Sequence, residues 1–295
     1  MEQWGIGIDV GGTKMWGVLG DSEGKILAEH KLETPAARGA FLRQINSLVH
    51  RLLGEAGISE KDVAGIGVGL PGRVAGKKGR VEWVPNLPDL NGLPLADMLG
   101  RKWGTDVYLQ NDGQLALAGE HWKGAAQGCM SAVMLTIGTG IGGAILVDGK
   151  IWTGFRETAG SMGWLTMDMS DRGDAELGWF ERMASGTAIT NRAKTLSPPL
   201  NSVQLFEAAG ERMEAKKMVE AVGHCLGTGI ANLASILDPE IVIVGGGVSQ
   251  QLSCFKDSIE EAMKRYASPA TRSTPVVPAQ LGNRAGVLGA LRLVF

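Results

Sequence analysis

Short apolar runs alternate along the chain with longer segments in which apolar residues recur every three or four positions. Near the N-terminus two apolar runs flank a glycine-rich turn and a third run ends near Glu33, which predicts a hairpin followed by a third strand. Residues 40–56 place Phe41, Ile45 and Leu48 at helical spacing and predict the first helix. The same reasoning predicts strands at 63–70, 81–84, 107–109 and 241–244, helices at 95–101, 113–122, 179–194, 216–237 and 285–293, and loops at 73–93 and 168–178. Because strands and helices alternate, the predicted fold class is α/β.

One strand-turn-strand pattern occurs twice. An apolar strand runs into Gly11-Gly12-Thr13-Lys14, and a similar strand runs into Gly138-Thr139-Gly140 about 130 residues later. An apolar strand follows each turn (15–19 and 144–147), so the repeat suggests two related halves. Glycines let backbone N–H groups approach an anion closely. We therefore expect the two turns to hold one polyphosphate from both sides.

The domain organisation follows from this repeat. We place the junction near residue 115, which gives a small α/β lobe at 1–115 and a large α/β lobe at 116–283. The last predicted helix, within 284–295, is expected to return to the small lobe.

Composition excludes several classes of protein. A chain of 295 residues that is 44% hydrophobic and 20% charged is an ordinary globular protein of two-domain size. A net charge of −2, without a cluster of Lys and Arg, argues against a nucleic-acid partner. The longest uncharged run, 131–147, is too short and too rich in glycine for a membrane helix, and no signal peptide is visible. Three widely spaced cysteines (Cys129, Cys225, Cys254) predict reduced thiols and a cytoplasmic protein.

Two carboxylates are candidates for chemistry, each with an ordinary alternative. Asp9 follows a strand and precedes the first glycine turn, so it either starts a turn or holds Mg²⁺ through water beside a phosphate. Asn111-Asp112 lies between a predicted strand and helix, which suits an N-cap or a general base at the carboxyl end of a strand. The N–H groups of that helix are expected to keep Asp112 ionised.

Two glycine clusters are candidates for nucleotide binding. Residues 138–143 match a dinucleotide fingerprint only superficially, because a strand and not a helix follows them. Gly245-Gly246-Gly247-Val248 follows a strand that is expected to be buried, and it is either a tight turn or a surface for a flat adenine.

Taken in order, a series of segments resembles the ROK family of sugar kinases and related proteins, over nearly the whole length. They are Asp9-Val10-Gly11-Gly12-Thr13-Lys14, Gly69-Leu70-Pro71-Gly72, Pro85-Asn86-Leu87-Pro88, Asn111-Asp112, Gly138-Thr139-Gly140-Ile141-Gly142-Gly143, Ala184-Ser185-Gly186-Thr187-Ala188 and Gly245-Gly246-Gly247-Val248. The resemblance implies a two-lobed actin-like ATPase (ribonuclease H-like) fold with a nucleotide cleft between the lobes.

The resemblance also implies roles for particular residues. Asp112 becomes the base that takes a proton from the sugar hydroxyl. Sugar contacts are implied at Gly72, Asn86, Asn111, Asp112, Ser161, Trp164 and Glu181, and contacts to ATP at Asp9, Gly11, Gly12, Thr13, Lys14, Gly138, Thr139, Gly140, Gly246 and Gly247.

Departures from the family pattern are equally informative. Ser161 stands where the family carries a sugar-binding Glu, and Trp164 stands where it carries a His that supports a zinc site. Arg172, Asp174 and Trp179 replace the zinc-binding cysteines, so we expect no structural zinc. We expect the indoles of Trp164 and Trp179 to pack near each other in its place.

The sequence therefore predicts an ATP- and Mg²⁺-dependent carbohydrate kinase that phosphorylates a hydroxyl of a sugar or sugar-like polyol. The expected setting is the cytoplasm, without nucleic acid or membrane, and as a homodimer. A non-catalytic sugar-sensing ROK-like protein is the alternative, although the first strand begins too early to leave room for a DNA-binding helix-turn-helix. An actin-like ATPase fits Gly69-Leu70-Pro71-Gly72 and Asn111-Asp112 less well.

Overall fold

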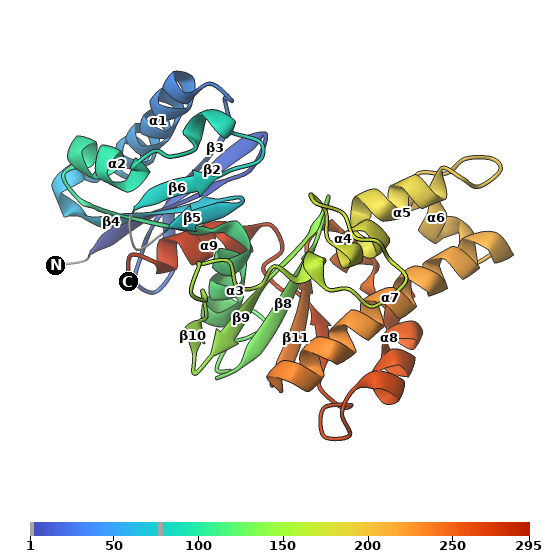
Figure 1. Ribbon diagram of the computed structural model, residues 1–295. Helices are drawn as coiled ribbons and strands as arrows, with labels where there is room; N and C mark the ends of the chain where they lie inside the picture. The colour runs from blue at the N-terminus through green and yellow to red at the C-terminus, as the bar shows by residue number, and fades with distance from the viewer. Residues whose placement is uncertain (1–2, 76–78) are drawn as a thin grey trace. The chain divides into compact units, whose positions relative to one another are not determined.

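The computed structural model describes residues 3–75 and 79–295, which form two compact units (Figure 1). Unit 1 takes the chain up to Gln127 together with 153–159 and 283–295, and unit 2 takes 128–152 and 160–282. The division near residue 115 expected from the sequence thus lies instead at Gln127, and residues 153–159 return to unit 1. The physical reason is that the helix after residue 111 packs on the last helix of the chain, where the backbone at Gly289 touches the Leu115 carbonyl.

A five-stranded sheet in the order β3-β2-β1-β4-β7 forms the centre of unit 1. The pairs β1–β2 and β2–β3 are antiparallel, whereas β1–β4 and β4–β7 are parallel. Its strands are β1 (Trp4–Val10), β2 (Lys14–Asp21), β3 (Ile26–Glu33), β4 (Val63–Leu70) and β7 (Asp106–Asn111). A separate antiparallel pair joins β5 (Arg73–Ala75) to β6 (Arg80–Trp83). β6 matches the short strand predicted at 81–84, whereas β5 lies where a loop was expected, and residues 76–78 of that segment lie outside the described residues.

Unit 2 repeats this sheet topology strand for strand. Its sheet has the order β10-β9-β8-β11-β12, with β8–β9 and β9–β10 antiparallel and β8–β11 and β11–β12 parallel. The strands are β8 (Ala132–Ile137), β9 (Ile141–Val147), β10 (Lys150–Ile151), β11 (Ile241–Gly245) and β12 (Val276–Pro278). The repeat in the sequence is therefore a repeat of the whole sheet, and each glycine turn joins the first two strands of its own sheet.

Helices follow the predicted pattern with three differences. They are α1 (Arg38–Ala56), α2 (Leu95–Trp103), α3 (Asp112–Lys123), α4 (Trp179–Ala184), α5 (Gly186–Ala193), α6 (Ser202–Ala208), α7 (Met213–Leu237), α8 (Leu252–Tyr266) and α9 (Arg284–Arg292). The single helix expected at 179–194 is divided, because Ser185 takes an extended backbone and its hydroxyl accepts from the N–H of Ala188. Helices α6 and α8 were not predicted from the sequence.

Helices cover both faces of the unit 1 sheet. Leu48 and Leu52 of α1 contact the sheet at Gly17, and α9 packs on the other face, where Gly7 touches its backbone. Because a side chain at Gly7 would collide with Leu291, glycine is required for this close approach. In unit 2, α4, α7 and α8 bury Phe180, Leu226 and Phe255 in one core with β8 and β11. The two strands that each glycine turn joins are therefore held in a packed sheet, which fixes both ends of the turn.

Within the described residues, none of the helices is long and apolar enough to span a membrane.

Candidate active site

The turn between β1 and β2 presents unused N–H groups at the surface of unit 1. The N–H of Gly11 donates to the carbonyl oxygen of Lys14 over 2.9 Å and closes the turn. Within residues 3–75 and 79–295, the N–H groups of Gly12 and Thr13 have no protein acceptor, and both residues are exposed. A Cβ on Gly12 would lie 3.2 Å from Nδ2 of Asn86, so that amide borders the turn. Free N–H groups beside an amide suit an anion that carries hydroxyl or phosphate oxygens.

The junction of β7 and α3 places Asp112 as the first helical residue. Oδ1 of Asn111 accepts from the N–H of Gln114 over 3.2 Å, which is an N-cap bond, and its Nδ2 donates to the carbonyl of Gly72 over 2.9 Å. The N-cap interpretation therefore holds for Asn111. Oδ1 of Asp112 accepts from the N–H of Gly113 over 2.8 Å. Asn111 thus joins the turn at Gly72 to the helix that carries Asp112.

Burial dominates the electrostatics of both carboxyl groups. The pKa of Asp9 is raised to about 7, first by burial and second by the charge of Asp112. Burial raises the pKa of Asp112 to about 6, although hydrogen bonds from the backbone and from Asn111 oppose the shift. The N–H at the start of the helix lowers this pKa, as expected, but desolvation outweighs it. A pKa near 6 still leaves the group ionised at pH 7 and more basic than an ordinary aspartate.

Small residues leave room around the Asp9 carboxylate. A Cβ on Gly286 would lie 2.8 Å from one carboxylate oxygen, and a Cβ on Gly69 would lie 3.4 Å from the other. In the described part of the chain nothing donates a hydrogen bond to Asp9, and its charge interacts with that of Asp112. Two partly buried carboxylates match the donor set that Mg²⁺ takes in phosphate sites, where one or two carboxylates and phosphate oxygens bind it.

The second glycine turn, between β8 and β9, has the same construction. The N–H of Gly138 donates to the carbonyl of Gly140 over 3.0 Å, and Thr139 is exposed. Among the described residues, the N–H groups of Thr139 and Gly140 find no protein acceptor. The next N–H, that of Ile141, donates to Oε2 of Glu181 over 2.8 Å. Glu181, expected from the resemblance to contact sugar, therefore also fixes the end of this turn.

A pocket of about 560 Å³ in unit 2 gathers three of the motifs. Gly186 donates from its N–H to the carbonyl of Gly138 over 2.8 Å, which joins the start of α5 to the turn. Gly246 has a φ of +79°, and a side chain on it would collide with Ile137, whereas Gly247 faces open space. The lining comprises Gly138, Thr139, Gly186, Thr187, Gly247 and Val248, with Thr190, Asn191, Lys194, Ser202, Gln250 and Gln251 among the polar residues and Ile189, Val203 and Phe206 among the apolar ones. Gly246 shapes the backbone, while Gly247 borders the space itself.

Most polar side chains of this pocket were not among the site residues expected from the sequence. Thr187, Thr190, Asn191 and Lys194 lie three or four residues apart on and just after α5, which puts them on one helical face. This spacing can be read from the sequence. A single continuous helix over 179–194, however, does not single out the helical face that these four residues share.

The segment at Ser161 and Trp164 differs from expectation. Both residues are exposed, Trp164 by 54%, while Trp179 packs against the core of unit 2. Among the described residues no contact between the two indole rings is found, but the backbone of Trp164 lies against Gly178, the neighbour of Trp179, so the expected packing of the two indoles stays a prediction. Across those same residues, no group of three or more His, Cys, Asp or Glu side chains is arranged to hold a metal.

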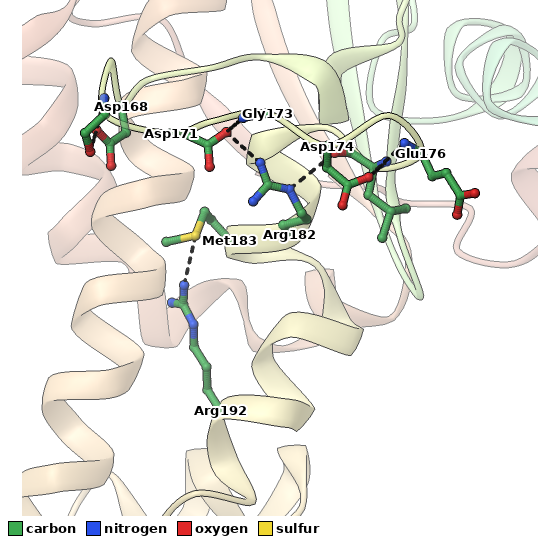
Figure 2. Close-up of polar contacts among 10 residues, drawn as sticks. Asp168, Asp171, Gly173, Asp174, Glu176, Arg182, Met183 and Arg192 are labelled. Carbon is green, nitrogen blue, oxygen red and sulfur yellow. Dashed lines mark hydrogen bonds and ion pairs between the residues drawn. The ribbon is translucent and has the colours of Figure 1, made fainter.

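An arginine occupies the centre of this region instead. Figure 2 shows the guanidinium of Arg182 between Asp171 and Asp174, whereas Arg192 on the next helix points to Met183. Nη2 of Arg182 donates to Oδ2 of Asp171 over 2.7 Å.

The sequence profile of the ROK family matches residues 5–295. The glucokinase of Streptomyces coelicolor is 32% identical over 311 residues, which cover 98% of this chain and 96% of that protein. Among solved structures, a ROK hexokinase from Thermus thermophilus is 28% identical with a TM-score of 0.85, covering 98% of this chain and 97% of that one. A ROK family glucokinase from Streptomyces griseus, in complex with glucose and AMPPNP, is 30% identical with a TM-score of 0.79, covering 98% of both chains. These matches confirm the expected fold class, that of the two-lobed actin-like ATPases.

Proposed function

Because the chain belongs to the ROK family, we propose that it is an ATP-dependent kinase that phosphorylates a hydroxyl of a sugar or sugar-like polyol. The proposal is supported by a glycine turn with unused N–H groups in each unit and by the carboxyl group of Asp112 in unit 1, whose pKa is raised to about 6. A glucokinase that is similar to this chain has been solved in complex with glucose and AMPPNP. That complex supports ATP as the phosphoryl donor.

The glycine turns are proposed to bind the phosphates. The N–H groups of Gly12, Thr13, Thr139 and Gly140 carry no internal hydrogen bond in the described residues, so they are available to phosphate oxygens. Phosphoryl transfer depends mainly on such positioning and on neutralising charge. The 560 Å³ pocket beside Thr139 is large enough for a nucleoside, which we assign to the adenosine of ATP.

Asp112 is proposed to be the general base. As the substrate hydroxyl oxygen forms its bond to the γ-phosphorus, the bond from that phosphorus to the oxygen of ADP breaks and the hydroxyl proton passes to Asp112. A pKa of about 6 suits this task, because the carboxylate is ionised at neutral pH yet accepts a proton more readily than an ordinary aspartate.

Asp9 fits a role as the residue that holds Mg²⁺. Its side chain is partly buried, lacks a hydrogen-bond donor among the described residues and interacts electrostatically with Asp112. A bound Mg²⁺ would neutralise phosphate charge as the γ-phosphoryl group is transferred.

Sugar binding is assigned to the residues implied by the resemblance. Asn86 borders the turn at Gly12, and Asn111 carries Asp112 at its helix terminus. The remaining sugar contacts are proposed at Gly72, Ser161, Trp164 and Glu181. Because Ser161 is shorter than Glu and uncharged, we infer that this enzyme prefers a substrate that lacks a free hydroxyl at that end of the ring.

A non-catalytic sugar sensor is the competing function. Such a protein requires sugar contacts. It does not require a base with a raised pKa, such as Asp112, or a carboxylate without a hydrogen-bond donor among the described residues, such as Asp9. A kinase assay with ATP and Mg²⁺ across hexoses, amino sugars, glycosides and cyclitols separates the two functions. Formation of ADP together with a phosphorylated sugar supports the kinase, and sugar binding without phosphorylation of any member supports the sensor.

Three other expectations stay proposals. We propose that the protein is a homodimer, that it carries no zinc, and that it acts in the cytoplasm. The described cysteines, Cys129, Cys225 and Cys254, are all free thiols, in keeping with a reducing compartment.

A further inference from the structure

The loop at 168–178 is folded on its own aspartates. Oδ1 of Asp168 accepts from the N–H and the hydroxyl of Ser170 over 2.8 and 2.7 Å. Oδ2 of Asp171 accepts from the N–H of Gly173 over 2.9 Å, and Oδ1 of Asp174 accepts from two N–H groups, at Glu176 and at Leu177. These bonds span only two or three residues, so they shape the loop without joining it to the rest of unit 2.

One side chain supplies the longer connections. Arg182, on α4, donates from Nη2 to Oδ2 of Asp171 over 2.7 Å and from Nε to the carbonyl of Leu177 over 3.3 Å. The side chains of Arg182 and Asp171 are only 27% and 17% exposed, so this pair is better shielded than a typical surface ion pair. A single guanidinium therefore holds both the middle and the end of the loop against α4 (Figure 2).

Helix α4 is too short to hold its own position. It runs for six residues from Trp179 to Ala184, and Gly178 at its N-terminus offers no side chain to cap it. Helices of this length are not stable alone, so tertiary contacts must fix its orientation. These contacts include the buried side chain of Phe180, the bond from its N–H to the carbonyl of Leu165, the bonds of Arg182 to the loop, and the bond between Glu181 and the N–H of Ile141.

Arg182 and Glu181 are neighbours in the chain but hold different parts of the site. Glu181 reaches the N–H that directly follows Gly138-Thr139-Gly140, and its carboxylate also borders Gly140. Arg182, the next residue of α4, reaches the 168–178 loop. A change in the loop that rotates α4 would therefore move the Glu181 carboxylate away from the glycine turn.

We propose that Arg182 is a positioning residue, which ties the 168–178 loop to α4 and so keeps the Glu181 carboxylate on the N–H of Ile141. The role of the glycine turn in binding phosphate, and that of Glu181 in binding sugar, rest on the proposed function. The contact between Arg182 and the loop, and its effect on Ile141, do not.

The primary test uses hydrogen exchange on the protein without ligands. Arg182→Met keeps the apolar stem of the side chain but removes both of its hydrogen bonds to the loop. Hydrogen exchange should then accelerate about tenfold or more in peptides covering 139–145 and 168–178, because a charge-assisted hydrogen bond is lost. Arg172→Met is the matched control, because Arg172 lies in the same loop, is exposed and makes no hydrogen bond or ion pair with the described residues. The control should exchange like the wild type.

Kinetics and a second pair of variants separate positioning from folding. Arg182→Met should raise KM for the sugar by about tenfold with a smaller loss of kcat, and Arg182→Lys, which keeps the charge, should recover part of the loss. Asp171→Ala should also accelerate exchange in both peptides, and the double variant should lose less than the sum of the two single variants, because both remove the bond between Arg182 and Asp171. Asp171→Ala also provides the test if Arg182→Met does not fold.

Exchange at 139–145 that stays at the wild-type rate in both Arg182→Met and Asp171→Ala overturns the proposal. Additive effects of the two substitutions would overturn it as well, because independent losses mean that they do not share one contact. Since the exchange measurement needs no substrate, it judges the role of Arg182 even if the kinase assay fails.

Discussion

The most informative single change is Asp112→Asn, because it should abolish turnover and yet stabilise the protein. Burial raises the pKa of Asp112 from its ordinary value of 3.8 to about 6. A carboxyl group whose pKa is higher in the folded state is easier to ionise after unfolding, so its ionisation favours the unfolded chain. The cost begins as the pH rises through 3.8 and is complete above about 6.

The size of the effect follows from the same values. Each unit by which the pKa differs between folded and unfolded states is worth about 1.4 kcal/mol, so the full cost is roughly 3 kcal/mol. Asparagine has no charge to lose, and its Oδ1 can still accept from the N–H of Gly113. The variant should therefore be more stable than the wild type by roughly 3 kcal/mol at pH 8 and by about half as much at pH 5.

Urea unfolding at pH 5, 6 and 8, without nucleotide or Mg²⁺, measures this difference. Asp257→Asn is the control, because Asp257 is exposed on α8 and its substitution should leave the pH dependence unchanged. An Asp112→Asn protein that is less stable than the wild type at pH 8, or a gap that does not grow between pH 5 and pH 8, would refute the assignment of a buried, desolvated carboxyl.

Three further predictions concern activity and composition. Because protonated Asp112 cannot accept the hydroxyl proton, kcat/KM should fall as the pH drops through the pKa of about 6. The assay measures kcat/KM from pH 5 to 8 at saturating Mg²⁺, and a flat profile would exclude Asp112 as the base. Glucose should not be the best substrate, since Ser161 cannot form the charge-assisted bonds of a Glu and their loss weakens transition-state binding by roughly 2–5 kcal/mol; a substrate panel in which glucose ranks first in kcat/KM contradicts this. Purified protein should contain no stoichiometric zinc, because Arg172, Asp174 and Trp179 cannot supply a tetrahedral thiolate set; elemental analysis that finds about one zinc per chain would disprove it.

Much of the fold could be predicted from the sequence because local signals agree with the tertiary structure. The apolar run at 63–70 coincides with β4, and both glycine turns fall between antiparallel strand pairs, as the strand-turn-strand pattern predicts. The division of 179–194 was missed although Gly186 is a helix breaker, since the apolar spacing continues across it. Helix α8 carries Phe255, Ile259 and Met263 at helical spacing and was predictable from the same rule.

The candidate site was only partly accessible to sequence reasoning. The position of Asp112 followed from its strand–helix junction, but the direction of its pKa depends on how deeply the folded chain buries it. The bond between Arg182 and Asp171 depends on how an irregular loop returns to α4, and no periodic pattern encodes such a path. The resemblance pointed to the zinc ligands that are replaced in this loop, without indicating the arginine that joins the loop to α4.

The central claim is that Asp112 acts as the base of a sugar kinase, and the turnover number of Asp112→Asn with the best substrate of the panel tests it most directly. The account predicts a kcat lower than that of the wild type by about 10²–10⁴, with ATP still bound at near wild-type affinity, because only the proton acceptor is removed. A kcat equal to that of the wild type would contradict it.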